Sequence, residues 1–308
     1  MKKIFLFSVV ASLLLFTACK KDKTKEDTGE NGNEQPVVVA PYFSVSANTK
    51  VVFSPGNLQW SATNGGTTAT THAVAGGGTA AGTWRFAPNQ WDTIGADNKN
   101  ISPSYQGWID LFGWCTSGYD NKFPYMTSNT NTDYGNGENN IAGTNYDWGV
   151  YNAIYNPKTK TTDAPGTWRT LTKDEWVWLL DSRSTSSGIR YAKGKVNGIQ
   201  GLIILPDNWN TSTYALNNTN VAEIAYTSNT INSTDWEKIE NTGAVFLPVS
   251  GFRSGLVLDY INRGYYWATT PKNTQQAYYM CITEANLFSA DPSKRCQGRL
   301  VRLVKEVQ

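Results

Sequence analysis

Apolar and polar residues alternate along several short stretches near the start of the chain's apolar-rich part. Phe43, Val45 and Ala47 alternate with polar residues, and two further apolar stretches, 51–53 and 58–60, follow shortly after them. Alternation with a period of two places every second side chain on the same face of a β-strand. The pattern therefore predicts short strands that begin near residue 43.

A β-hairpin is the clearest local prediction. The apolar-rich stretches 189–196 and 199–205 are separated by Asn197 and Gly198. An Asn-Gly pair readily adopts the two positive φ angles that a two-residue hairpin turn requires. We therefore expect these stretches to pair as antiparallel strands. Later strands are expected at 244–247, 265–268, 277–282 and 300–304.

Two short helices are indicated by their capping signals. Thr172 with Glu175, and Thr234 with Glu237, have the spacing of a capping box, and each pair is followed by apolar residues at helical spacing. The fold class that follows is α+β, with twisted antiparallel sheets, two short helices and long loops. A Gly-, Thr- and Ala-rich stretch at 63–83 is predicted to be a flexible loop.

The N-terminus has the layout of an export signal. Lys2 and Lys3 precede an apolar run at 4–16, and a small residue, Ala18, precedes Cys19. The run is too short to span a bilayer as a helix, and a small residue before a cysteine is what lipoprotein processing requires. We expect residues 1–19 to be a lipoprotein signal and Cys19 to carry the lipid anchor; an ordinary signal peptide is the alternative.

Composition divides the rest of the chain into two parts. Residues 20–41 contain no aromatic residue and are charged and Gly/Asn-rich at first, so they are predicted to be a disordered tether. Residues 42–308 carry aromatic residues throughout and are predicted to form one domain. The expected location is outside the cytoplasm, at the outer membrane or the cell surface.

Charge argues against a nucleic-acid partner. The chain has 27 basic and 25 acidic residues, and two of the basic ones lie in the predicted signal, so the exported part is nearly neutral. Nucleic-acid binding depends on an excess of Lys and Arg that neutralises phosphates.

The one histidine, His72, lies in the predicted loop, so neither a His-based triad nor a His-rich zinc site is expected.

Seven blocks of sequence carry a family resemblance. In order they are FSVSANTKVVFSPGNLQW (43–60), TWRFAPNQWDTIG (83–95), GWIDLFGWCTSGY (107–119), WRTLTKDEWVWLLDSRSTSSGIRYAKGKVNGIQGLIILPDNW (168–209), GAVFLPVSGFR (243–253), YYWATT (265–270) and GRLVRLV (298–304). Together they resemble the FISUMP-type major paralogous domain of bacterial surface and secreted proteins. The resemblance implies a C-type-lectin-like fold, in which the first and last strands pair. WRTLTKDEWVWLLDSR also resembles a helix of formylglycine-generating enzymes.

Three cysteines remain after Cys19. Cys281 and Cys296 lie on either side of the segment EANLFSADPSK, so we predict a disulfide between them. Closing a loop of that length stabilises a fold by about 3 kcal/mol. Cys115 is then expected to be a buried free thiol. The sequence around Cys281 and Cys296, MCIT and RCQG, lacks the neighbours expected of a formylglycine-generating oxidase.

Calcium is the one cofactor for which the sequence offers candidate ligands, and no other cofactor is expected. Asp133, Glu138 and Asp147 lie in NTDYGNGENNIAGTNYDWG, a stretch rich in the oxygen ligands that calcium prefers. The stretch does not have the spacing of an EF-hand. Solvated turns stabilised by Asn and Asp side chains are the alternative.

Two classes of function remain open. With 12 Trp and 16 Tyr, the chain has many rings on which a sugar could stack, but rings also build a core. The first hypothesis is a binding or adhesion module for a glycan or a protein; the second is an enzyme of formylglycine-generating or carbohydrate-active type. For the first, Arg253, Asp259, Arg263 and Tyr265 are predicted to line the ligand-facing surface. Trp209, Tyr214, Tyr265, Tyr266 and Trp267 lie in or near predicted loops and are the aromatic candidates for a surface role, although Trp267 is expected to be buried.

Overall fold

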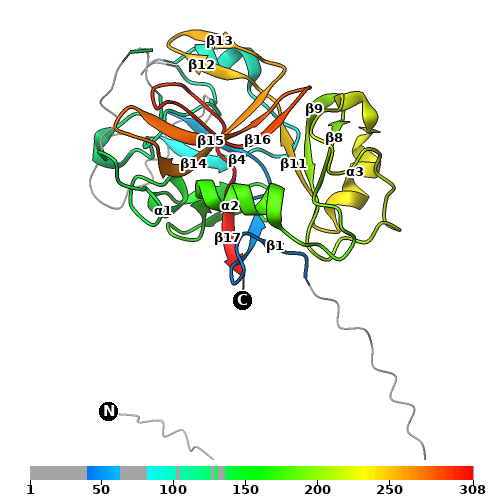
Figure 1. Cartoon of the computed structure of the whole chain (residues 1–308). Helices are drawn as coiled ribbons and strands as arrows, with labels where there is room; N and C mark the ends of the chain where they lie inside the picture. The colour runs from blue at the N-terminus through cyan, green and yellow to red at the C-terminus, as the bar shows by residue number, and fades with distance from the viewer. Residues whose placement is uncertain (1–39, 63–81, 102–104, 126–128, 131–135, 308) are drawn as a thin grey trace, which may run out of the picture. The chain divides into compact units, whose positions relative to one another are not determined.

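Short strands in five small sheets form most of the regular structure (Figure 1). The computed structural model describes residues 40–307 except 63–81, 102–104, 126–128 and 131–135. The predicted signal with Cys19, nearly all of the predicted tether, His72 and Asp133 lie outside the described residues. Within the described part, every helix is too short or too polar to cross a membrane.

The first and last strands of the chain lie in one sheet. Its order is β1 (Phe43–Ser44), β2 (Lys50–Phe53), β17 (Leu303–Val307) and β7 (Arg169–Thr170). All three pairs are antiparallel, and β17 pairs with β2 rather than with β1. Figure 1 shows the blue and red ends of the folded part side by side. The two ends of the folded chain are therefore fixed to each other.

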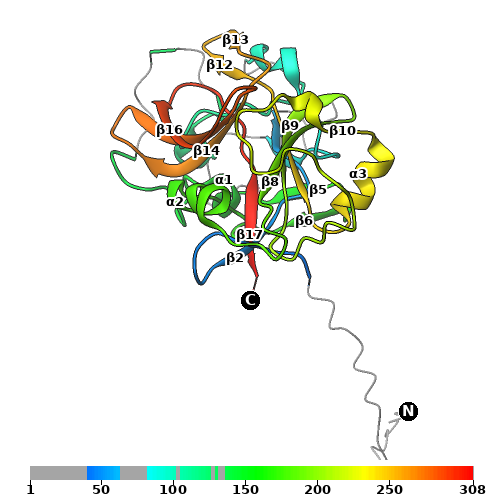
Figure 2. The same ribbon diagram turned by 45° about the vertical axis from the view of Figure 1, so that its right-hand side comes forward.

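The predicted hairpin is confirmed. Strands β8 (Tyr191–Val196) and β9 (Ile199–Ile204) pair in antiparallel register around Asn197 and Gly198, whose φ angles are 48° and 83°. Strand β11 (Val245–Pro248) pairs antiparallel with β9, and β10 (Thr230–Ile231) pairs parallel with β8. Figure 2 shows this sheet with α3 beside it. The sheets are thus mostly, but not entirely, antiparallel.

Three further sheets complete the β-structure. One contains β3 (Leu58–Ser61), β4 (Thr83–Phe86), β5 (Ile154–Asn156) and β6 (Thr161–Asp163), and its β4–β5 pair is parallel. Another contains β14 (Gly264–Pro271), β15 (Gln276–Ile282) and β16 (Leu287–Lys294). The last is the two-stranded hairpin of β12 (Phe252–Ser254) and β13 (Val257–Asp259). The late strands expected from the sequence therefore exist, although the last begins at Leu303.

Helices are short. The α-helices are α1 (Trp148–Tyr151), α2 (Lys173–Val177) and α3 (Ser233–Glu240); η1 (Gly95–Lys99), η2 (Tyr119–Asn121) and η4 (Tyr226–Ser228) are 3₁₀-helices, and η3 (Trp178–Ser182) is a π-helical turn that continues α2. Two α-helices were predicted. The four-residue α1 was missed because one helical turn is too short for a periodic pattern.

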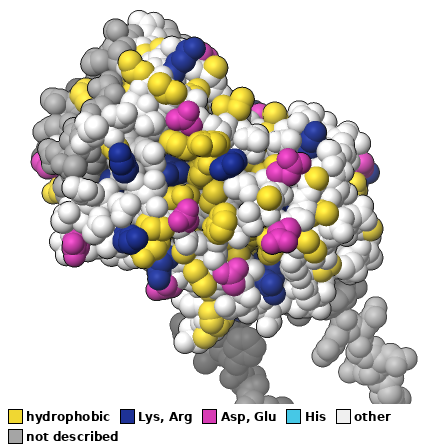
Figure 3. Space-filling model, turned by 45° about the horizontal axis from the view of Figure 1, so that its top comes forward, with side chains coloured by type: hydrophobic (Ala, Val, Ile, Leu, Met, Phe, Trp, Pro, Cys, Tyr) yellow, Lys and Arg dark blue, Asp and Glu magenta, His cyan; other side chains and the backbone are white. Residues whose placement is uncertain are grey.

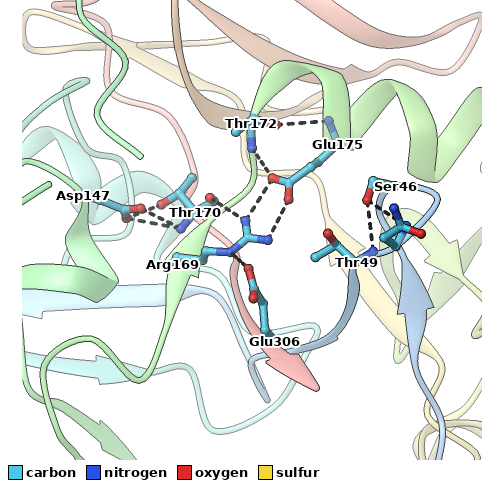
Figure 4. Close-up of polar contacts among 9 residues, drawn as sticks. Ser46, Thr49, Asp147, Arg169, Thr170, Thr172, Glu175 and Glu306 are labelled. Atoms are coloured by element: carbon cyan, nitrogen blue, oxygen red, sulfur yellow. Dashed lines mark hydrogen bonds and ion pairs between the residues drawn. The ribbon is translucent and has the colours of Figure 1, made fainter. Parts of the chain in front are cut away.

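The capping box of α2 is confirmed. Thr172 Oγ1 accepts a hydrogen bond from Glu175 N at 3.2 Å, and Glu175 Oε2 accepts one from Thr172 N at 2.7 Å. Arg169 Nη2 lies 2.6 Å from Glu175 Oε1, and Arg169 Nε lies 3.0 Å from Glu306 Oε1. Figure 4 shows how these contacts join the start of α2 to β7 and β17.

The predicted cap of α3 is wrong. The helix begins at Ser233, and Asn232 Oδ1 accepts from Asp235 N at 2.8 Å. Asn232 and Asp235 have the same three-residue spacing as Thr234 and Glu237 but lie two residues earlier. Asn is also a better N-cap residue than Thr. The helix therefore takes the earlier signal.

The aromatic residues considered as surface candidates are mostly core, and Trp267 is buried as expected. Trp209 is 3% exposed, Tyr265 is 5% exposed, and Tyr266 and Trp267 are fully buried; Tyr214 alone is partly exposed. Tyr266 packs in one core cluster, and Tyr265 and Trp267 pack in another on the other side of β14. A strand buried on both faces has no polar side, so its sequence does not alternate.

The predicted disulfide between Cys281 and Cys296 is wrong. Both are free, buried thiols, as is Cys115, for which a free thiol was predicted. Cys281 lies opposite Phe288, whereas Lys294, two residues before Cys296, lies opposite Gln276. Five residues of strand, about 16 Å, separate Gln276 from Cys281, and a disulfide needs Cα atoms within about 7 Å. The segment between the cysteines forms strand β16, and Cys296 follows the end of that strand, whereas Cys281 lies opposite its beginning.

Asp147 is a structural carboxylate, which corrects its assignment as a calcium candidate. It is fully buried and accepts from Thr170 N at 3.0 Å and from Thr170 Oγ1 at 2.7 Å (Figure 4). It also caps α1 by accepting from Gly149 N. These donors occupy the oxygens that calcium would need. Glu138 is exposed, and Asp133 lies outside the described residues.

A candidate binding groove beside the β12–β13 hairpin

Two of the four predicted ligand-facing residues are buried. Arg253 is fully buried in β12, where its guanidinium donates to the carbonyl oxygens of Leu111 and Gly255, each at 3.1 Å. Tyr265 is 5% exposed and lies beside the guanidinium of Arg299, 4.8 Å from its ring centre. Carbonyl oxygens and ring faces thus replace water around these groups. The prediction that Arg253 and Tyr265 face a ligand is wrong.

The other two predicted residues lie at the open end of the same hairpin. Asp259 and Arg263 are both partly exposed. The Arg263 guanidinium lies 4.4 Å from the ring centre of Tyr260, and the Arg263 carbonyl accepts from Gly251 N at 2.8 Å. Tyr260 is itself 55% exposed. The structure therefore separates the predicted set into a buried half and a surface half.

Four exposed apolar or aromatic side chains project from this hairpin and the turn after it. Leu256, Val257, Tyr260 and Ile261 are 57%, 58%, 55% and 68% exposed; we call them the apolar tip. Figure 3, which turns this end of the molecule forward, shows hydrophobic side chains gathered at the surface among scattered charged ones. Contiguous exposed apolar surface of this kind marks interaction sites on soluble domains.

A hollow of about 690 Å³ lies beside the apolar tip, and we call it the apolar hollow. Its walls are η1, the turn between β8 and β9, the segment after β11, and the tip itself. Ile199 and Val249 line it together with Leu256, Val257, Leu258 and Ile261. Binding pockets for small ligands typically have volumes of about 300–1,000 Å³ and mostly apolar walls. The apolar hollow has the size and the lining of a binding site.

The wall formed by η1 is held by one buried pair of side chains. Asn98 and Asp110 are both fully buried, and Asn98 Nδ2 donates to Asp110 Oδ1 at 2.7 Å. Asn98 Oδ1 accepts from the backbone N–H groups of Asp110 and Leu111 at 2.9 and 3.1 Å, and Asp110 Oδ2 accepts from Ile94 N at 3.0 Å. Burial raises the pKa of Asp110 to about 6. This pair fixes η1 to the core beneath it.

A second hollow, of about 450 Å³, adjoins the first, and we call it the polar hollow. Thr93 and Ile199 line both. The polar hollow is also lined by Gln59, Arg85, Trp91 and Asp92. Arg85 Nε donates to Gln59 Oε1 at 2.9 Å, and its guanidinium lies 3.7 Å from the ring centre of Trp108. The two hollows adjoin across Thr93 and Ile199, and we call them together the groove, with an apolar part and a polar part.

The charged residues among the described lining of the two hollows are Lys99, Arg85 and Asp92. Among the described residues that line the two hollows, Asp92 is the single carboxylate. Glycoside hydrolysis in most families uses two carboxylates that flank the bond. The chain matches no protein-family model, no curated protein and no solved structure to which it was compared.

Sequence reasoning placed its ligand-facing candidates in this part of the chain but did not select its exposed aliphatic residues. The four predicted ligand-facing residues lie between positions 253 and 265, and the apolar tip lies in the same stretch. Charged and aromatic residues were chosen there, whereas the most exposed apolar side chains are those of Leu256, Val257 and Ile261. An apolar run, Leu256 to Leu258, directly after Gly255 was the available signal, because a turn between strands this short cannot bury its tip. Lys99 and Ile199, far away in sequence, carried no such signal.

Proposed function

We propose that this chain is an exported bacterial lipoprotein whose domain from residue 42 onward binds a ligand in the groove. The apolar tip supports this proposal most strongly. Four side chains, each more than half exposed, project beside a hollow of about 690 Å³. Burial of apolar surface away from water is favourable by about 25 cal/mol per Å². A protein surface with this much exposed apolar area in one place is suited to burial against a partner.

We further propose that the domain is of the FISUMP type, with a C-type-lectin-like fold. Two features support this assignment. Strand β17 pairs with β2, so the ends of the domain meet in one sheet. The segment that resembles the helix of formylglycine-generating enzymes forms α2 with its capping box. Long loops and short hairpins between the sheets supply the groove, as a loop-built binding surface requires.

The proposed ligand is a glycan or an extracellular protein. Amide, guanidinium and carboxylate groups from Gln59, Arg85 and Asp92, with the ring of Trp91, suit the hydroxyls and C–H faces of a sugar. The apolar tip suits the side chains of a protein. The module is therefore proposed to act in adhesion or capture at the cell surface rather than in catalysis.

A glycan and matrix-protein array tests this function. The chain from Lys20 onward, which contains every described residue, is expected to bind at least one array component. The double variant Leu256→Ser, Ile261→Ser should lose that binding by tenfold or more, because it removes the apolar surface of the tip. Val221→Ser with Phe288→Ser, which changes side chains 40% and 47% exposed elsewhere, is the matched control. Equal binding by both double variants would refute the groove as the site.

The lipid anchor has its own test. Cys19→Ala is expected to release the protein from the membrane fraction or to leave it unprocessed, because the thiol that accepts lipid is gone. The measurement is fractionation with and without detergent, together with the intact mass. Membrane association that persists, with normal processing, would show that residues 1–19 are an ordinary signal or that another segment holds the membrane.

A further inference from the structure

One charged side chain lines the apolar hollow. Among the described lining residues, Lys99 alone is ionised, and it is exposed at the end of η1. No carboxylate in the described part of the chain forms an ion pair with it. A free ammonium beside an apolar wall attracts an anion, and charges placed in this way set the register and specificity of a partner. The hollow is therefore complementary to an apolar ligand with one negative charge.

A buried hydroxyl in the same hollow lacks a partner. Ser250 lines the hollow and is 5% exposed, yet its Oγ has no hydrogen-bond partner among the described residues. Buried polar groups in native structures are nearly always paired. This hydroxyl has less than 1 Å² of accessible surface, so among the described residues it is an unpaired polar group beneath the wall of the hollow and not a contact exposed to the ligand.

The backbone of β13 also presents polar groups on the side away from β12. Arg253 exchanges both of its backbone hydrogen bonds with Gly298, at 2.9 and 2.8 Å, so its N–H and C=O point away from β13. In an antiparallel ladder, paired residues alternate between bonded and unbonded. Leu258, which lies opposite Arg253, therefore directs its own N–H and C=O outward, away from β12.

This outer edge of β13 borders the apolar hollow. Leu258 is one of the lining residues, and η1 lies beside β13. The hairpin contains no third strand in the described structure. An edge strand with free backbone groups is a template for an added strand, and alternate side chains of that strand then enter neighbouring pockets.

We propose that the partner is a protein, and that it binds as an extended segment along β13 with apolar side chains in the hollow and an acidic group beside Lys99. The proposal rests on the groove being the binding site and names the class of its ligand. A glycan is less suited to this part of the groove, because a sugar needs ring faces and several polar partners, whereas aliphatic side chains form most of these walls.

Labelled peptides test the proposal on the chain from Lys20 onward. The probes are fluorescein-labelled peptides of alternating valine and threonine that carry one glutamate at the N-terminal or the C-terminal end, with lysine-bearing counterparts. Fluorescence anisotropy gives their dissociation constants. For one of the two placements, the glutamate peptide should bind about threefold to fivefold more tightly than its lysine counterpart, the range expected of an exposed ion pair. Methylating alternate backbone nitrogens should weaken it by tenfold or more.

Charge reversal provides the decisive comparison. Lys99→Glu should reverse the preference, so that the lysine peptide binds more tightly, whereas Lys294→Glu, at an exposed lysine of β16, should leave it unchanged. A preference that Lys99→Glu does not alter, or peptides that do not bind, would overturn the proposal. If glycans alone bind and Leu256→Ser, Ile261→Ser abolishes their binding, the partner is not a protein but the groove remains the site. If those tip substitutions change nothing, both proposals fail.

Discussion

Replacing Asn98 by alanine is expected to lower the free energy of unfolding by about 3–5 kcal/mol. The side chain pairs with the Asp110 carboxylate and accepts from two backbone N–H groups, and all of these partners are buried. A buried donor left without a partner costs about 1–3 kcal/mol, and more when the group lost is a neighbour of a charge. Urea denaturation, followed by intrinsic tryptophan fluorescence, measures the change.

Asn100→Ala is the matched control for Asn98→Ala. Asn100 lies at the end of the same helix but is exposed, and its amide bonds to Asp97 Oδ1 at 3.3 Å. Its replacement should cost less than about 0.5 kcal/mol, as most surface substitutions do. Equal losses for the two variants would show that η1 is not held by the buried pair. Asn98→Ala should also weaken ligand binding, because η1 forms one wall of the apolar hollow.

Replacing Asp147 by alanine is expected to lower the free energy of unfolding by about 2–4 kcal/mol. Thr170 N, Thr170 Oγ1 and Gly149 N would lose their acceptor in a fully buried site. Asp147→Asn should also be destabilising, because its NH₂ group would have to face one of these donors. Thermal unfolding monitored by circular dichroism measures both changes.

Glu138→Ala is the control for the Asp147 variants, since both carboxylates were calcium candidates and Glu138 is exposed. It should leave the melting temperature within about one degree of the original, because surface substitutions usually change stability by less than about 0.5 kcal/mol. A ligand of the native state raises stability by mass action. A melting temperature that rises with millimolar calcium in the original chain, and no longer does so in Asp147→Ala, would contradict the structural role of Asp147.

Local signals predicted local structure well. The Asn197-Gly198 turn and the capping box of Thr172 and Glu175 each depend on residues a few positions apart, so the sequence contains all of their determinants. The same kind of signal failed at α3 only because Asn232 offered a stronger cap two residues before Thr234. Residue propensity and spacing therefore predict where such elements begin to within about one turn.

Pairings between distant segments were beyond this reasoning. The register of β15 against β16 places Cys281 opposite Phe288, and no property of the cysteines themselves indicates that register. The burial of β14 on both faces likewise depends on core clusters assembled from many segments. The disulfide predicted from proximity in the sequence was therefore wrong, because the pairing of distant strands determines which cysteines lie close together.

Residue type was also a poor guide to exposure. Arg299 is 2% exposed, and its guanidinium lies 3.8 Å from the ring centre of Tyr279, with Phe252, Tyr265 and Trp267 also around it. Cation–π contacts and carbonyl oxygens allow arginine to lie inside this domain, as Arg253 does. Charge was therefore a poor guide to exposure, and the proposed binding surface rests on the exposed aliphatic residues of the tip instead.

Hydrogen–deuterium exchange with a bound ligand tests the groove most directly. With a ligand found on the array, the account predicts slower exchange of backbone amides in 93–99, 198–200 and 256–261, including the outward N–H of Leu258 if the ligand pairs with β13. Protection confined to another face, such as the surroundings of Val221 or Phe288, with unchanged exchange in these three segments, would contradict it.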